Sequence, residues 1–197
     1  YKRQLAEDVV DETTGEILAE AGYEHYEVSN YAKQGKEARH NIGYWKRVPY
    51  LGVGLGAASL IGEVRYSNIR EIEAYIKACG NISAKEIDGV PALNLHESAD
   101  AISRHAQMEE FMFLGLRVMA GVSGTEFEKR FGKTMEDVYG DVLRKHEEEG
   151  LLQIERKEDR KEAAAAEPAK GKTNIEKVML TTKGGDVSNY VFADFLL

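Results

Sequence analysis

Side chains suited to ligand and metal chemistry gather within residues 39–45. They are Arg39, His40, Asn41, Tyr44 and Trp45. An imidazole is a common iron ligand, and aromatic rings can stack against a flat ligand. A polar run that contains glycine precedes the segment and predicts a loop, where unusual side chains indicate function more often than core residues do. A hydrogen-bonded loop histidine without a ligand is the alternative that one sequence leaves open.

Residues 50–61 follow this loop and are apolar and small, with glycine at positions 52, 54 and 56. We expect a strand here, because alternate positions of a strand place all three glycines on one face. Such a bare face lets a ligand or another backbone approach closely. The run is not a dinucleotide-binding fingerprint, since its glycine spacing differs and no helix follows at once.

Several motifs together resemble one family. They are YEVSNYA at 26–32, HNIGYW at 40–45, YLGVGLGAAS at 50–59, MEEFMFLGLR at 108–117 and LTTKGGDVSNYVF at 180–192. This set resembles the oxygen-independent coproporphyrinogen III oxidase-like family of radical S-adenosylmethionine (SAM) proteins. Within that family it is most similar to the haem chaperone branch, HemW, whose His-Asn-x-x-Tyr-Trp motif is associated with haem. The resemblance extends over nearly the whole chain.

The resemblance implies a set of site residues. His40, Asn41, Tyr44 and Trp45 would contact haem, with His40 as the iron ligand, and Ala32 would lie near bound SAM. The alternative for the two aromatic residues is that they cover the barrel mouth as hydrophobic plugs.

Three neighbouring cations, Arg39, Lys46 and Arg47, could pair with haem propionates. The other histidines share no pattern with carboxylates or cysteines, and we interpret them as surface or core residues. They are His25, His96, His105 and His146.

A single cysteine, Cys79, limits what this chain can hold. The family's 4Fe-4S cluster is bound by a Cys-x-x-x-Cys-x-x-Cys loop, and cluster ligation needs several thiolates. We therefore expect a C-terminal portion of a longer radical-SAM protein, without the cluster-binding motif and inactive by itself. Cys79 is predicted to be a small buried hydrophobic residue.

Three functions follow for the intact parent. The first is a haem chaperone that holds haem and passes it to an acceptor protein. The second is a true coproporphyrinogen III dehydrogenase, which decarboxylates a porphyrinogen oxidatively with the help of SAM and a cluster. The third is a regulatory or interaction module with a winged helix.

The composition is that of an ordinary water-soluble protein, with 43% hydrophobic and 30% charged residues among 197. A net charge of -8 argues against nucleic-acid or anionic-membrane partners. No apolar run is long enough to span a membrane, and the first residues of the sequence lack the apolar h-region of a signal peptide. The lone cysteine fits a reducing, cytoplasmic location.

The pattern of elements predicts an α/β region followed by a mainly helical one. Residues 1–80 are expected to be the last part of a radical-SAM (β/α) barrel: a helix over 5–21, a strand over 23–31, the loop 33–49, the strand 50–61, a short strand over 64–66 and a helix capped by Asn68. Loops that follow barrel strands form the active face. Residues 81–97 are expected to be a connection.

For residues 98–197 the order of expected elements predicts a winged-helix-like C-terminal domain. A long helix should begin at Ser98, a second should be capped at Ser123 and end at Gly132, and a third should run from Thr134 to Gly150. A hairpin of 151–156 with 177–182 and a closing helix through Phe195 should complete it, with 158–174 disordered. The acidic third helix argues against DNA binding.

We predict that this chain binds no iron–sulfur cluster, because a single thiolate cannot hold one. Anaerobic reconstitution with iron and sulfide, followed by desalting, should leave substoichiometric iron and the same low level in Cys79→Ser. Stoichiometric iron and sulfide that disappear in Cys79→Ser would contradict this expectation.

Overall fold

The computed structural model describes residues 13–157 and 175–196. The chain divides into two compact units, which we treat separately: Arg47–Gln107, and the described parts of Tyr1–Lys46 with Met108–Leu197. No helix within the described ranges is long and apolar enough to cross a membrane. The predicted disorder of 158–174 falls outside them.

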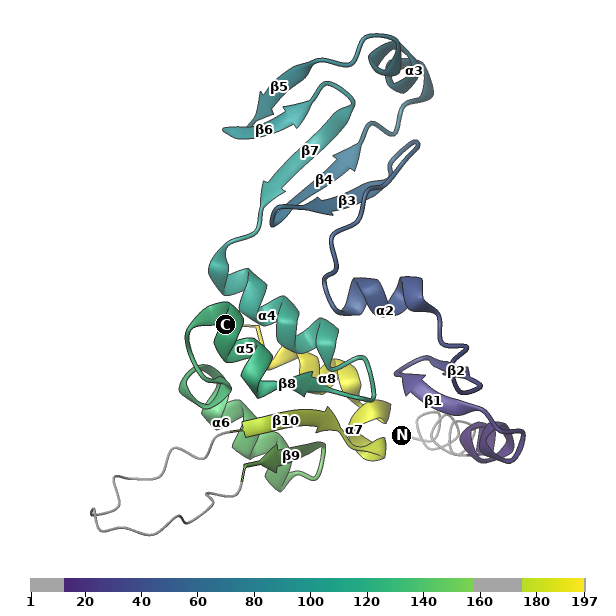
Figure 1. The fold of residues 1–197 in the computed structure, drawn as a ribbon, viewed down its shortest axis with the longest axis vertical. Coiled ribbons are helices and arrows are strands. Elements are labelled where there is room, and N and C mark those ends of the chain that lie inside the picture. The colour runs from purple at the N-terminus through teal and green to yellow at the C-terminus, as the bar shows by residue number, and fades with distance from the viewer. Residues whose placement is uncertain (1–12, 158–174, 197) are drawn as a thin grey trace. The chain divides into compact units, whose positions relative to one another are not determined.

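The C-terminal part of the larger unit has the predicted winged-helix-like order of elements (Figure 1). Three antiparallel strands form a sheet in the order β8-β10-β9, and three helices precede or interrupt it. The elements are α4 (Arg104–Gly115), β8 (Val122–Ser123), α5 (Gly124–Phe131), α6 (Met135–Glu148), β9 (Leu152–Arg156), β10 (Ile175–Leu180), α7 (Thr182–Asp186) and α8 (Ser188–Ala193).

The helix boundaries here arise from local signals in the sequence. Ser123 caps α5 by accepting a hydrogen bond from the Glu126 amide at 3.3 Å. Thr134 and Asp137 form a reciprocal capping box at the start of α6. Gly132 ends α5 in the left-handed region, with φ of 63°. These predicted boundaries are confirmed.

Aromatic rings fill the core of this unit. Phe127 is fully buried, with ring centroids 5.4 Å from Phe111, 4.8 Å from Phe131 and 6.1 Å from Tyr139. Tyr139 in turn meets Phe195 edge-on at 5.2 Å. The Phe- and Met-rich stretch of α4 is therefore core, as predicted, and the closing segment is anchored by Phe195.

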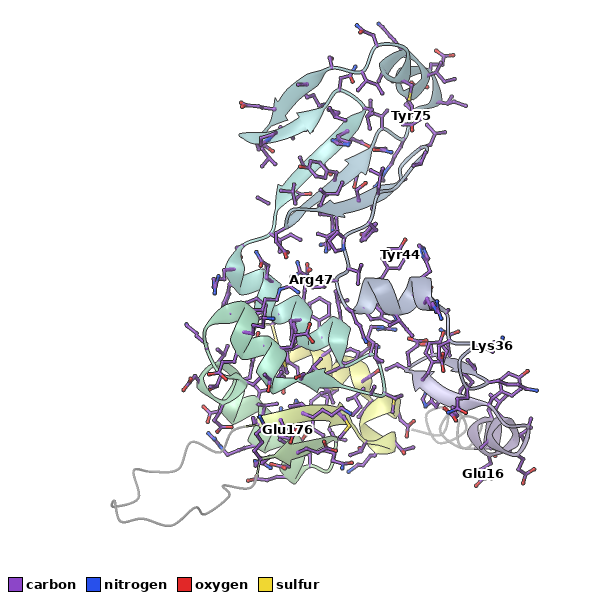
Figure 2. The ribbon with its side chains drawn as sticks, in the orientation of Figure 1. Glu16, Lys36, Tyr44, Arg47, Tyr75 and Glu176 are labelled. Carbon is purple, nitrogen blue, oxygen red and sulfur yellow. The ribbon has the colours of Figure 1, made fainter. Side chains whose placement is uncertain are left out.

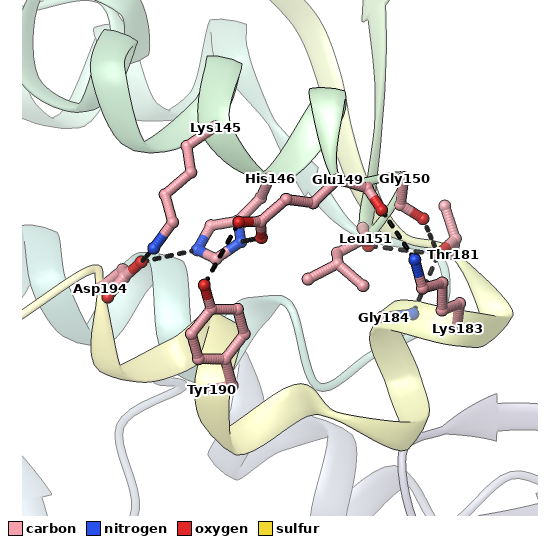
Figure 3. A network of polar contacts seen from close by, with 10 residues as sticks. All are labelled: Lys145, His146, Glu149, Gly150, Leu151, Thr181, Lys183, Gly184, Tyr190 and Asp194. Atoms are coloured by element: carbon pink, nitrogen blue, oxygen red, sulfur yellow. Dashed lines mark hydrogen bonds and ion pairs between the residues drawn. The ribbon is translucent and has the colours of Figure 1, made fainter.

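A polar network joins α6 to the closing helix (Figure 3). The fully buried His146 ring has Nδ1 3.1 Å from a Glu149 oxygen and Nε2 3.0 Å from an Asp194 oxygen. Lys145 donates to the same Asp194 oxygen at 2.6 Å, and the Tyr190 hydroxyl donates to Glu149 at 3.3 Å. His146 is a core residue, one of the two interpretations that the sequence left open, and its contact with Asp194, 48 positions further along, was not predicted.

The smaller unit contains one three-stranded antiparallel sheet, in the order β3-β4-β7, and a separate hairpin, β5-β6. Its elements are β3 (Ala58–Ile61), β4 (Val64–Asn68), α3 (Ile72–Gly80), β5 (Ala84–Ile87), β6 (Val90–Leu93) and β7 (His96–Ala101). The segment expected to be a connection is therefore folded, because Val90 and Leu93 pair with Ile87 and Ala84 across a tight turn.

Three finer predictions in this unit are wrong. Ser98 begins no helix, because it pairs with Ser67 in the sheet. Glu71, not Asn68, caps α3 by accepting from two backbone amides, while Asn68 is buried in β4. Cys79 is exposed rather than buried.

The N-terminal segment of the larger unit also differs from expectation. Residues 13–20 are helical, but the predicted strand 23–31 is a short hairpin of β1 (Glu24–Glu27) and β2 (Asn30–Ala32). Part of the predicted loop forms the helix α2 (Arg39–Trp45). A (β/α) barrel needs parallel strands. All the sheets formed by the described residues are antiparallel, with two or three strands, so the barrel remnant is not seen.

Two glycines with the same backbone twist give a matched test of packing. Gly121 and Gly132 have φ of 70° and 63°, which costs an L-residue about 1–2 kcal/mol. A Cβ at Gly121 would lie 2.2 Å from the Val178 carbonyl oxygen, whereas one at Gly132 would meet nothing within 4 Å. Gly132→Ala should therefore cost only the backbone strain, and Gly121→Ala clearly more. Urea unfolding followed by Trp45 fluorescence should show this order, and equal losses would contradict it.

The Asp194 network should make stability depend on pH. The Lys145 ammonium, which donates to Asp194, lowers the pKa of that carboxyl below its ordinary value. Because the folded pKa is depressed, the stabilisation is present above the ordinary pKa near 4 and is lost as pH falls through the folded value. Asp194→Asn should lower the urea midpoint at pH 7, and the difference from wild type should shrink by pH 3.

Asp141 is the matched control, because it also pairs with a cation of α6 but its side chain is fully solvated. Asp141→Asn should change the midpoint little at either pH. A deficit in Asp194→Asn that stays constant from pH 7 to pH 3 would show that the carboxylate contributes by packing alone.

Candidate functional site

The helix α2 presents the motif singled out in the sequence. A turn precedes it, in which Gly35 has φ of 75° and its amide donates to the Glu37 carboxylate at 2.9 Å. Backbone amides, its own and that of Gly35, lower the pKa of Glu37. The helix has no side-chain cap at Ala38 and buries none of its residues completely. Its position therefore depends on contacts of its partly buried side chains.

One face of α2 places His40 beside Tyr44. Residues four apart in a helix are neighbours, and here the ring centroids lie 4.5 Å apart at 71°, edge to face. Both side chains are exposed, and Figure 2 shows Tyr44 projecting from α2. Within the described part of the chain no hydrogen bond occupies the His40 ring. The structure therefore offers an accessible imidazole next to an aromatic edge.

The other two motif residues lie on a different face. Asn41 and Trp45, again four apart, are half-buried. The Arg117 guanidinium lies 4.4 Å from the centre of the Trp45 ring, a cation–π contact. The Trp45 Nε1 is buried without an acceptor in the described residues. The four-residue motif is therefore split between an open pair and a packed pair.

A buried carboxylate next to these elements was not recognised from the sequence. Glu27, at the end of β1, is 1% exposed. One of its oxygens accepts from the Ser29 amide at 3.1 Å and from the Asn30 side chain, which closes the turn to β2. Its other oxygen is buried without a donor among the described residues. Ala32, the predicted SAM neighbour, is buried at the end of β2.

The three cations expected to pair with haem propionates differ in their exposure. Arg39 and Lys46 are exposed. Arg47, labelled in Figure 2, is 4% exposed and its guanidinium lies 2.6 Å from Glu63 within the smaller unit. Arg47 is therefore already paired with Glu63, and its role toward a propionate stays a prediction. Arg117 was not predicted as a site residue, although it closes the motif at 108–117, because it lies far in sequence from the segment 39–45.

The glycine-rich segment 50–57 is not a strand but a loop whose backbone is held by side-chain hydrogen bonds. The Gly52 amide donates to Ser59 Oγ at 2.9 Å, and Asn68 Nδ2 donates to the Gly54 carbonyl at 2.9 Å. Gly54 and Gly56 have φ of 106° and 62°, which a strand cannot accommodate. The expected close approach of a backbone does occur at Gly52, where a Cβ would lie 2.1 Å from the Ala58 carbonyl oxygen.

No group of three or more His, Cys, Asp or Glu side chains within 13–157 and 175–196 could hold a metal ion. An iron ligand from this part of the chain would therefore act with few protein partners. A lone axial histidine under a macrocycle that supplies its own nitrogens is compatible with this arrangement.

Comparison with known proteins identifies the C-terminal unit. Residues 102–158 match the family model of the HemN C-terminal domain. The matched segment begins just before α4 and ends just beyond β9, and it includes the helices α5 and α6.

Whole-chain comparisons agree with this match. The chain is 34% identical to the haem chaperone HemW of Lactococcus lactis over 92% of its length, and 37% identical to that of Bacillus subtilis over 66%. A mitochondrial radical S-adenosyl methionine domain-containing protein of Bos taurus is 30% identical over 71% of the chain. The chain spans only 40%, 32% and 32% of these relatives.

A solved structure supports the fold. The coproporphyrinogen III oxidase HemN of Escherichia coli, described as a radical SAM enzyme, aligns with 95% of this chain and 40% of its own. The TM-score is 0.62 at 17% identity, which is evidence for the fold alone. The sequence matches, rather than this likeness in fold, place the chain with the HemW haem chaperone family, with a HemN C-terminal domain at residues 102–158.

Proposed function

We propose that this chain is the haem-binding portion of a radical-SAM haem chaperone, with His40 as the axial ligand of its cargo. The observation that supports this most directly is the exposed His40 ring, placed edge-to-face with Tyr44 in a chain 34% identical to a haem chaperone. The activity of the whole protein is part of the proposal, since the chain spans 40% of that relative.

The residues of α2 fit a flat, iron-containing cargo. An imidazole needs a free nitrogen and open space above it to ligate iron, and the exposed His40 provides both. Tyr44 adds an aromatic surface at contact distance, and Asn41 adds an amide on the adjoining face. Haem would supply the iron, and the chain would supply the imidazole nitrogen and the aromatic ring beside it.

The same residues do not fit a 4Fe-4S cluster. One cysteine is present in the whole sequence, so we assign no cluster to this chain. For SAM, Ala32 stays a proposal, and it would act through its backbone because its methyl group is buried. The cluster and SAM therefore belong to the proposed intact protein.

Haem delivery is preferred over coproporphyrinogen III oxidation for a specific reason. The two bacterial relatives at 34% and 37% identity are haem chaperones, whereas the likeness to the oxidase, at 17%, concerns the fold. We also propose that a cytoplasmic acceptor protein receives the haem, and that residues 98–197 act as the C-terminal docking domain of the chaperone.

His40→Ala should abolish the red-shift of the Soret band that accompanies haem addition, because the iron loses its axial nitrogen. Tyr44→Ala should weaken binding less, since it removes a ring contact and leaves the iron bond. Haem titration by absorbance should give this order, with far-UV dichroism unchanged, because exposed positions contribute little stability.

His105→Ala is the matched control, because His105 is also an exposed histidine on a helix of this chain. It should titrate like wild type. If His40→Ala binds haem with the wild-type spectrum and affinity, His40 is structural and the proposed function fails.

A further inference from the structure

Arg117 lies just after α4 in a turn whose backbone is fixed. Its amide donates to the Leu114 carbonyl at 3.1 Å, and its carbonyl accepts from the Val28 amide at 2.9 Å. The side chain is half-buried. These two hydrogen bonds fix the backbone of Arg117 and so limit the direction in which its side chain can point.

The guanidinium packs between rings instead of pairing with an acceptor. It lies 4.4 Å from the Trp45 centroid and 5.9 Å from the Phe192 centroid. Its Nε is buried without a partner, and within 13–157 and 175–196 no carboxylate pairs with it. The Trp45 Nε1 beside it is a second buried donor without an acceptor. Buried donors are nearly always satisfied, so this pair needs an explanation.

Two other arginines of the larger unit form ion pairs with carboxylates of the same unit. Arg144 lies 2.6 Å from Glu136, and Arg156 forms two bonds to the Glu147 carboxylate at 2.7 Å and 2.6 Å. Glu27 is a buried carboxylate close to Arg117, since its backbone bridges to Val118. Its accepting oxygen serves the turn to β2, and it forms no ion pair with Arg117.

We propose that Arg117 and Trp45 form a carboxylate-binding site that receives a propionate of the haem held by His40, an inference that rests on the proposed function. A guanidinium matches a carboxylate with two parallel N–H donors, and the cation–π contact with Trp45 holds the group in place in advance. Trp45 and His40 belong to one helix, on different faces of it and about 7.5 Å apart along its axis. One macrocycle with acidic arms spans a separation of that order.

The test compares haem with its dimethyl ester, in which both carboxylates are blocked. Wild type should bind haem more tightly than the ester. Arg117→Gln should lower the affinity for haem about tenfold or more, because hydrogen bonds to charged groups are strong, and should leave the affinity for the ester unchanged. Its Soret band should keep the wild-type position, because His40 is intact.

Two further variants separate the site from general effects. Arg130→Gln is the control, since Arg130 is another half-buried arginine over an aromatic ring, Phe131, at 5.6 Å. It should bind both ligands like wild type. Arg117→Lys should show an intermediate loss, because it keeps the charge and loses the fork, and it serves in place of Arg117→Gln if that variant unfolds.

The outcomes distinguish this inference from the proposed function. If Arg117→Gln, or Arg117→Lys in its place, keeps wild-type discrimination between haem and the ester while His40→Ala loses ligation, the carboxylate site is wrong and the chaperone site stands. Equal losses for haem and the ester would also overturn it, because they would show that Arg117 supports the ring contact only. If His40→Ala ligates normally, the proposed function fails first.

Discussion

The N-terminal segment of the larger unit depends on a short backbone junction with the turn after α4. The Val28 amide donates to the Arg117 carbonyl at 2.9 Å, and the Met119 amide donates to the Tyr26 carbonyl at 3.1 Å. Glu27 and Val118 face each other between these bonds. The core leaves little freedom on the α4 side, because Leu116 is fully buried and a Cβ at Gly115 would lie 2.3 Å from Val122. These backbone bonds thus hold β1 against the turn after α4, whose own position is fixed by the core.

The split of the α2 motif follows from this arrangement. A helix of seven residues with no side-chain cap has little stability of its own, so its orientation must come from packing. Trp45 provides that packing through Arg117, and His40 and Tyr44 are thereby left on an open face. The half-buried Trp45 thus holds the helix, while the exposed His40 and Tyr44 are the pair available to the flat face of a cargo.

The sequence predicted the parts of the fold that local chemistry determines. Ser123, Gly132 and Thr134 mark boundaries by hydrogen bonds or φ values that involve at most a few neighbouring residues. Predictions failed where distant partners decide. The segment 50–57 has the composition of a strand, but Ser59 and Asn68 form hydrogen bonds with its backbone and hold it as a loop. The contact of His146 with Asp194 likewise joins residues that are far apart in the sequence. His40 could be singled out by residue type, whereas Arg117 could not, because its unpaired donors exist only in the folded chain.

The cations of α6, the third helix of the winged-helix-like unit, are paired with carboxylates of the same unit. The third helix of such units meets nucleic acid through cations. On α6, Arg144 is held by Glu136 and Asp141, and Lys145 by Asp194. The Lys145 pair instead fixes the segment after α8, and Phe192 of α8 contributes the second ring near Arg117. The Lys145–Asp194 pair thus helps to hold the end of α8, whose Phe192 lies near the proposed carboxylate site.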